Sequence, residues 1–139
     1  MRLLTICLIA ICGVVSAAPA PKDKTTGQKL VGKWQLVKSD QPLPEAVTYF
    51  IEFTKDGKLS LTIVPKNKDA VSTAMKGTYK LDDEKIDYTL ELANGGQKTE
   101  ILTIKKLTET DLVTTDPDNI KEEFERVKAE EKGEKKTKE

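Results

Sequence analysis

The sequence predicts an all-β protein, an antiparallel eight-stranded up-and-down β-barrel. Short runs of β-branched and aromatic residues alternate with polar residues, and turn residues separate one run from the next. Such alternation places one face of each strand in a core and the other in water, as in antiparallel sheets. Consecutive strands with short connections close most simply into a barrel, because closure removes exposed strand edges. The pattern leaves open whether the barrel closes fully or stays partly open.

The predicted strands follow one another without a long helix between them. They occupy residues 29–38, 47–54, 59–63, 74–81, 85–92, 98–107, 111–115 and 122–127. Asp56-Gly57 predicts a tight hairpin after the second strand, because Asp-Gly readily supplies the positive φ that such a turn needs. Asn94-Gly95-Gly96 predicts the turn after the fifth strand on the same grounds.

Large side chains on the inward phase of these strands are the candidate ligand contacts. They are Tyr49, Phe53, Tyr79, Tyr88 and Leu90. An eight-stranded barrel is just wide enough to be filled by its own side chains or to hold one small ligand. Two interpretations therefore stay open: these residues line a site for a small hydrophobic molecule, or they only pack the core.

The first 17 residues have the pattern of a secretory signal peptide. A basic residue, Arg2, precedes an apolar run from Leu3 to Val15, and small residues follow it. The run is about 13 residues, shorter than the roughly 20 that span a bilayer as a helix. We expect cleavage after Ala17, with Ala20 as the alternative, and no transmembrane segment in the mature chain. The sequence thus predicts a secreted or periplasmic protein.

The remaining chain divides into three parts. A polar linker is predicted for residues 18–28, the barrel for residues 29–127, and a disordered Lys/Glu-rich tail for residues 128–139. Both cysteines, Cys7 and Cys12, lie in the signal peptide, so the mature protein has no disulfide and no thiol. Its stability must therefore come from the core.

Composition excludes several classes of function. The chain has 23 basic and 23 acidic residues, so it lacks the excess of cations that nucleic-acid binding requires. It contains no His, which removes Ser-His-Asp and Cys-His nucleophiles and every His-ligated metal site. The acidic residues Glu52, Asp87 and Glu91 fall on outward phases and indicate surface charge. We expect no catalytic residue, no metal site and no cofactor, and hence a noncatalytic protein.

Two motifs within the predicted barrel, one on its first strand and one between its sixth and seventh strands, resemble those of lipocalins, a calycin-like fold. Gly32-Lys33-Trp34 resembles the Gly-x-Trp signature, and Thr110-Asp111-Leu112 resembles the Thr-Asp-Tyr turn with Leu in place of Tyr. The resemblance implies that Arg126, on the last strand, lies over the Trp34 indole and closes one end of the barrel. It also implies that Gly32 allows close packing at that end.

The pattern over residues 29–127 is similar to small bacterial lipocalin-like domains, in particular to a short exported paralogous family of planctomycete bacteria. This resemblance implies a fold and says little about activity. Two functions follow from the sequence. One is an exported barrel that binds a small hydrophobic ligand inside. The alternative is a structural or protein-interaction module with a fully packed core that contacts an envelope protein partner.

Overall fold

A computed structural model describes residues 25–67 and 69–128. The predicted signal peptide with both cysteines, the two candidate cleavage positions and the tail from residue 129 onward lie outside the described residues. So does the predicted linker up to residue 24.

The described chain folds into one short helix followed by eight strands. The elements are α1 (Thr26–Leu30), β1 (Gly32–Ser39), β2 (Val47–Phe53), β3 (Lys58–Pro65), β4 (Thr73–Asp82), β5 (Lys85–Glu91), β6 (Gln97–Leu107), β7 (Asp111–Thr115) and β8 (Lys121–Arg126). Every predicted strand is present, and the boundaries differ mostly by one or two residues. The second and fifth turns form as predicted, with positive φ at Gly57 and Gly95.

The strands form a closed barrel in which each pairs with its neighbours in sequence, and β1 pairs with β8. All these pairings are antiparallel; in the closing pair, Trp34 lies opposite Arg126 and Leu36 opposite Phe124. The predicted eight-stranded up-and-down barrel is therefore confirmed, and the barrel is closed rather than split. A register shift between Leu36 and Lys38 bends β1 along this seam.

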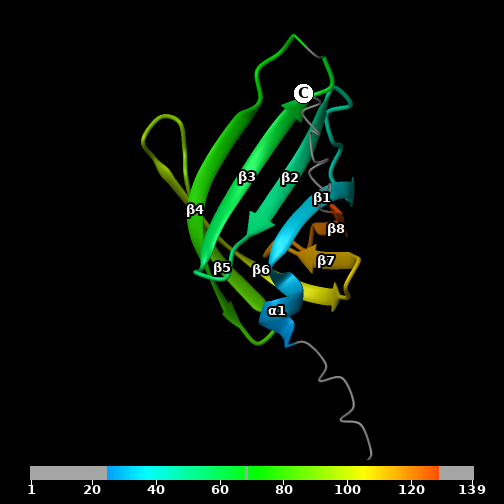
Figure 1. Ribbon diagram of the computed structural model, residues 1–139, viewed down its shortest axis with the longest axis vertical. Helices are drawn as coiled ribbons and strands as arrows, with labels where there is room; N and C mark the ends of the chain where they lie inside the picture. Colours follow the sequence, from blue (N-terminus) through cyan, green and yellow to red (C-terminus); the bar gives the residue numbers. More distant parts are fainter. Residues whose placement is uncertain (1–24, 68, 129–139) are drawn as a thin grey trace, which may run out of the picture.

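The two ends of the barrel differ (Figure 1). Helix α1 lies across the lower end in this view, while the β1–β2 and β3–β4 connections rise at the upper end. At the lower end, side chains fill the interior. The largest fully buried residues are Trp34, Phe53, Leu30, Ile86 and Leu112. The core is therefore concentrated toward the α1 end, which we call the closed end.

Helix α1 occupies part of the segment that the sequence predicts as a polar linker. Thr25 caps it: its hydroxyl accepts a hydrogen bond from the Gln28 backbone N–H, and the Gln28 side chain accepts one from the Thr25 N–H. This reciprocal capping box satisfies two backbone donors at the start of a helix. The end of the predicted linker is therefore helical, and Leu30 at the helix end is fully buried.

Candidate functional site

A cavity of about 470 Å³ opens at the end of the barrel opposite α1. Its apolar floor consists of inward residues of six strands. They are Leu36, Tyr49, Ile51, Leu61, Tyr88, Leu90, Leu102 and Phe124. Several of these, including Ile51 and Leu102, also belong to the buried core. The core therefore forms the floor of the cavity, and the cavity is continuous with the barrel interior.

One wall of the cavity carries a hydrogen-bonded polar cluster on β5 and β6. The Tyr88 hydroxyl donates to Glu100 Oε2 over 2.6 Å, and the Lys98 ammonium lies 2.8 Å from the same oxygen. Burial would raise the pKa of Glu100, but the hydrogen bonds from Lys98 and Tyr88 outweigh it and hold the pKa below its usual value. Burial and Glu100 raise the pKa of Tyr88. Glu100 is thus ionised and Tyr88 stays a donor.

Three further carboxylates line the cavity beside this cluster, those of Asp116, Asp118 and Glu122. Glu122 is half-buried on β8, and burial, followed by repulsion from Asp116 and Glu100, raises its pKa. Asp116 lies in the β7–β8 connection, where its Oδ1 accepts from the backbone N–H groups of Asp118 and Ile120 over 2.9 and 2.8 Å. The cavity therefore combines an apolar floor with an acidic wall.

The structure brings together the three residues predicted to close the barrel. The Arg126 guanidinium lies 4.1 Å from the centre of the Trp34 ring. It donates to the backbone carbonyls of Val31 (2.8 Å), Glu109 (2.5 Å) and Lys29. A Cβ at Gly32 would collide with the Arg126 side chain. These contacts tie β8, the chain after α1 and the β6–β7 turn together at the closed end.

The predicted ligand contacts divide between the two ends of the barrel. Tyr49, Tyr88 and Leu90 line the cavity. Phe53 and Tyr79 instead form an edge-to-face pair with ring centres 5.0 Å apart, and the Tyr79 hydroxyl donates to the Thr54 carbonyl over 2.8 Å. Phe53 is almost fully buried. The alternation predicts which side chains point into the barrel, but not how far along the barrel axis each one lies. The predicted set therefore combines residues from both ends of the barrel.

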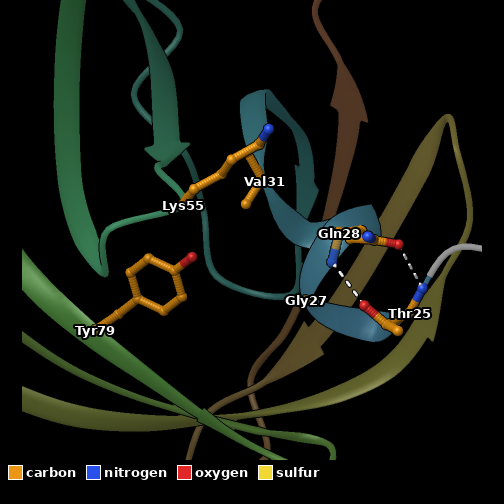
Figure 2. Close-up of a pocket in the computed structure, with 6 residues that line it drawn as sticks. All are labelled: Thr25, Gly27, Gln28, Val31, Lys55 and Tyr79. Atoms are coloured by element: carbon orange, nitrogen blue, oxygen red, sulfur yellow. Dashed lines mark hydrogen bonds between the residues drawn. The ribbon is translucent and has the colours of Figure 1, made fainter.

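Tyr79 also borders a second hollow, on the outside of the closed end (Figure 2). This hollow lies between α1 and the β2–β3 turn and is lined by Thr25, Gly27, Gln28, Val31, Lys55 and Tyr79. Figure 2 shows the hydrogen bonds of the capping box at its edge. It is open to solvent and separate from the cavity at the other end.

Sequence reasoning missed the polar residues of the cavity wall. Lys98 and Glu100 are in phase with the inward Leu102, and Glu122 is in phase with the inward Phe124. Period-two alternation could have found them. Residue type alone assigns a glutamate to the surface, because carboxylates are rarely buried. By contrast, Glu52, Asp87 and Glu91 are exposed, as predicted.

The described residues contain neither a candidate metal-binding cluster nor a helix that could span a membrane. Over residues 25–67 and 69–128, no group of three or more Cys, Asp or Glu side chains could hold a metal ion. In the same part of the chain, no helix is long and apolar enough to cross a membrane.

A closed barrel with one packed end and one hollow end is a fold that suits small ligands, as in lipocalins. A family model for the lipocalin-like domain matches residues 30–114, more than half of the chain. The protein therefore belongs to the lipocalin-like domain family.

Solved structures agree with this fold. A lipocalin-like protein from Bacteroides uniformis is 23% identical, with a TM-score of 0.54 over 71% of this chain and 99% of that one. An uncharacterized protein from Bacteroides eggerthii is 20% identical, with a TM-score of 0.52 over 70% and 99%. At these identities the likeness supports the fold alone. No curated protein matches.

Proposed function

We propose that this protein is a noncatalytic, exported lipocalin-like barrel that binds a small hydrophobic molecule in the cavity opposite α1. The observation that carries this proposal is the cavity of about 470 Å³ with its floor of buried core residues. Pockets for small molecules typically measure about 300–1,000 Å³, are mostly apolar, and occur in the mouths of β-barrels. The volume and the position meet this description, and the floor is apolar, whereas the wall carries charged side chains.

The interaction-module alternative requires a fully packed core and a surface for a partner. The cavity argues against the first requirement. The large hydrophobic residues exposed on strands do not support the second: Val37 lies on β1 and Ile101 on β6, and these strands are not neighbours. Single exposed hydrophobic residues are normal on protein surfaces. Binding inside the barrel is therefore the better-supported function.

Export and the narrower family assignment are part of the proposal and rest on the sequence. The pattern of residues 1–17 supports a cleaved signal peptide and a secreted or periplasmic location. The resemblance over residues 29–127 supports membership of the short exported planctomycete group. Mass spectrometry of the protein from its native cells would test the cleavage after Ala17, and cell fractionation would test the location.

Ligand uptake is tested with the neutral fluorescent probe N-phenyl-1-naphthylamine. Leu61 faces the cavity from β3, so Leu61→Trp should fill part of the space and weaken probe binding by about tenfold, the equivalent of 1.4 kcal/mol. Ile101→Trp is the matched control, because Ile101 is exposed on the outer face of β6. If the natural protein and both variants bind the probe with the same affinity, the probe binds outside the cavity. If the natural protein does not bind the probe, the proposed function is contradicted.

A further inference from the structure

The charges that line the cavity are unbalanced. Four of its lining residues are acidic, namely Glu100, Asp116, Asp118 and Glu122, whereas Lys98 is basic. The Lys98 ammonium already forms an ion pair with Glu100 Oε2 at 2.8 Å. The lining therefore presents a net negative charge to whatever enters. Such a charge favours cations and opposes anions, and the effect is stronger where the surroundings exclude water.

The carboxylates of this wall differ in whether their hydrogen-bonding capacity is already used. Glu100 accepts from Tyr88 and pairs with Lys98. Asp116 accepts two backbone N–H groups of its own turn. Asp118 is exposed. The half-buried Glu122 side chain makes no hydrogen bond or ion pair with any residue in the described ranges. Burial, Asp116 and Glu100 raise its pKa, and Lys98 offsets them only in part.

A second polar group beside Glu122 is also unsatisfied. Thr114 on β7 is the ladder partner of Glu122 on β8, and paired residues project from the same face of a sheet with their Cβ atoms about 5 Å apart. Thr114 is 1% exposed, and its hydroxyl has no hydrogen-bond partner among the described residues. Buried polar groups are normally hydrogen-bonded, so each exception calls for an explanation. An unsatisfied hydroxyl therefore lies next to the Glu122 carboxylate on the inner face of the barrel, while Glu122 alone of the two lines the cavity.

We propose that the ligand is a small amphipathic cation, whose apolar body lies on the cavity floor and whose protonated amine binds the Glu122 carboxylate. This inference rests on the proposed function, because it names the ligand class of the same cavity. The amine donates to Glu122 and satisfies its charge, while the hydrocarbon part contacts Ile51, Leu61 and Leu90. A fatty acid fits the floor equally well, but its carboxylate would meet the acidic wall.

The test compares decylamine, decanol and decanoic acid, which share one chain length and differ in the charge of the head group. Each competes with N-phenyl-1-naphthylamine for the purified protein at pH 7.5, below its micelle concentration. We expect decylamine to bind most tightly and decanoic acid least. Glu122→Gln should weaken decylamine by about tenfold, because the Gln oxygen still accepts a hydrogen bond but no longer carries the charge that strengthens it. It should leave decanol within about twofold.

Two further variants complete the design. Glu125→Gln removes the same charge from the exposed outer face of β8, so it should leave the affinity for decylamine unchanged. Glu122→Asp keeps the charge and should retain the preference for the amine over decanol. Circular dichroism and the urea midpoint verify that each variant folds.

The possible outcomes separate this inference from the function on which it rests. Uptake of the neutral probe and decanol, with decanoic acid bound as tightly as decylamine, would overturn the cationic ligand and leave the apolar site intact. The same conclusion follows if Glu122→Gln and Glu125→Gln weaken decylamine equally. Absence of binding for the probe and all three ligands would instead reject the proposed function itself.

Discussion

Arg126 shows how one side chain can hold several distant segments together. Its planar guanidinium stacks on Trp34 and donates to three carbonyls from two parts of the chain. Stacking contributes about 0.5–2 kcal/mol, and hydrogen bonds from a charged donor contribute about 1.5–3 kcal/mol. We expect Arg126→Ala to lower the free energy of unfolding by about 3 kcal/mol, measured by urea denaturation with Trp34 fluorescence as the probe.

Arg126→Lys is the informative companion to this variant. Lysine keeps the positive charge but lacks the rigid planar fork of donors. We expect it to recover less than half of the lost stability. Full recovery would mean that the charge alone matters and that the three-carbonyl geometry does not.

Glu122 should reduce the stability of the unliganded protein at neutral pH. Burial, with Asp116 and Glu100, raises its pKa in the folded state, so between the ordinary and the raised pKa the folded protein binds more protons than the unfolded chain. The free energy of unfolding therefore decreases as the pH rises through that window, and the loss is complete above the folded pKa. We expect Glu122→Gln to have a higher urea midpoint than the natural protein at pH 8, with a smaller difference at pH 4.

The groups facing Glu122 determine how this measurement is read. Asp116 in the β7–β8 connection and Glu100 on β6 raise its pKa, and Lys98 opposes them. Because other carboxylates of the protein also change charge over this pH range, urea midpoints of Glu125→Gln across the same range give the baseline. A midpoint of Glu122→Gln that stays below the natural protein at pH 8 would contradict the sign of the prediction.

At the residue scale, the sequence predicts the apolar half of the site better than the polar half. Alternation correctly turns Tyr49, Tyr88 and Leu90 inward, because every second position on a strand faces the core. The same alternation also turns Glu100 and Glu122 inward. Residue type assigns glutamates to the surface. The acidic wall can therefore be predicted only if the position of a residue in the strand alternation is given more weight than its residue type.

Among the elements, α1 is the one that hydrophobic periodicity does not reveal. Its five residues, Thr26–Leu30, are too few for a helical repeat to be seen. The signal was local instead, in the Thr25-x-x-Gln28 capping box. Tertiary contact stabilises the rest: Leu30 is buried, and its carbonyl accepts from the Trp34 indole N–H over 2.8 Å.

Removal of the helix cap tests how much α1 depends on this local signal. We expect Thr25→Ala to lower the free energy of unfolding by about 1 kcal/mol, the usual effect of losing an N-cap hydroxyl. Thr26→Ala, at the next residue, removes a hydroxyl without removing the cap and should stay within about 0.5 kcal/mol of the natural protein. Chemical denaturation of both variants measures the difference, and equal effects would show that the cap is not the cause.

The β4–β5 pair depends on close backbone approach at Gly77. A Cβ there would collide with the Thr89 carbonyl on β5, which is backbone and cannot move aside. We therefore expect Gly77→Ala to destabilise the protein by about 2–3 kcal/mol through overpacking. Gly95→Ala is the control: a Cβ there meets nothing within 4 Å, and only its φ of +80° is unfavourable. We expect this strain to lower the free energy of unfolding by about 1 kcal/mol. A larger destabilisation by Gly95→Ala than by Gly77→Ala in thermal unfolding would contradict the prediction.

For the whole molecule, the sequence predicts the order of the strands from its turns, and their closure only from the general argument that a barrel leaves no exposed strand edge. Turns such as Asp56-Gly57 and Asn94-Gly95 fix which strands are consecutive, because short turns require antiparallel neighbours. The two-residue alternation of apolar and polar side chains does not predict that β1 pairs with β8, because these strands are separated by most of the chain. Closure there depends on specific pairs such as Trp34 with Arg126. Local alternation cannot detect this contact, and the resemblance to lipocalins supplied it.

Closure also determines how the whole barrel should respond to its ligand. The floor of the cavity belongs to the same core that holds the barrel together, so the site is absent in the unfolded chain. A ligand that binds only the folded state raises the free energy of unfolding by about 2.7 kcal/mol at 100 times its dissociation constant. For a domain of about 100 residues this corresponds to a rise in Tm of roughly 10 °C.

We therefore expect decylamine, at a fixed concentration about 100 times its dissociation constant, to raise the Tm by roughly this amount. Calorimetry should show the same shift for Glu125→Gln and, because of the weaker affinity, about half of it for Glu122→Gln. A Tm that falls while decylamine still displaces the probe would mean that the amine binds the unfolded chain as well. The acidic wall would then act as a surface charge rather than as part of a preformed site.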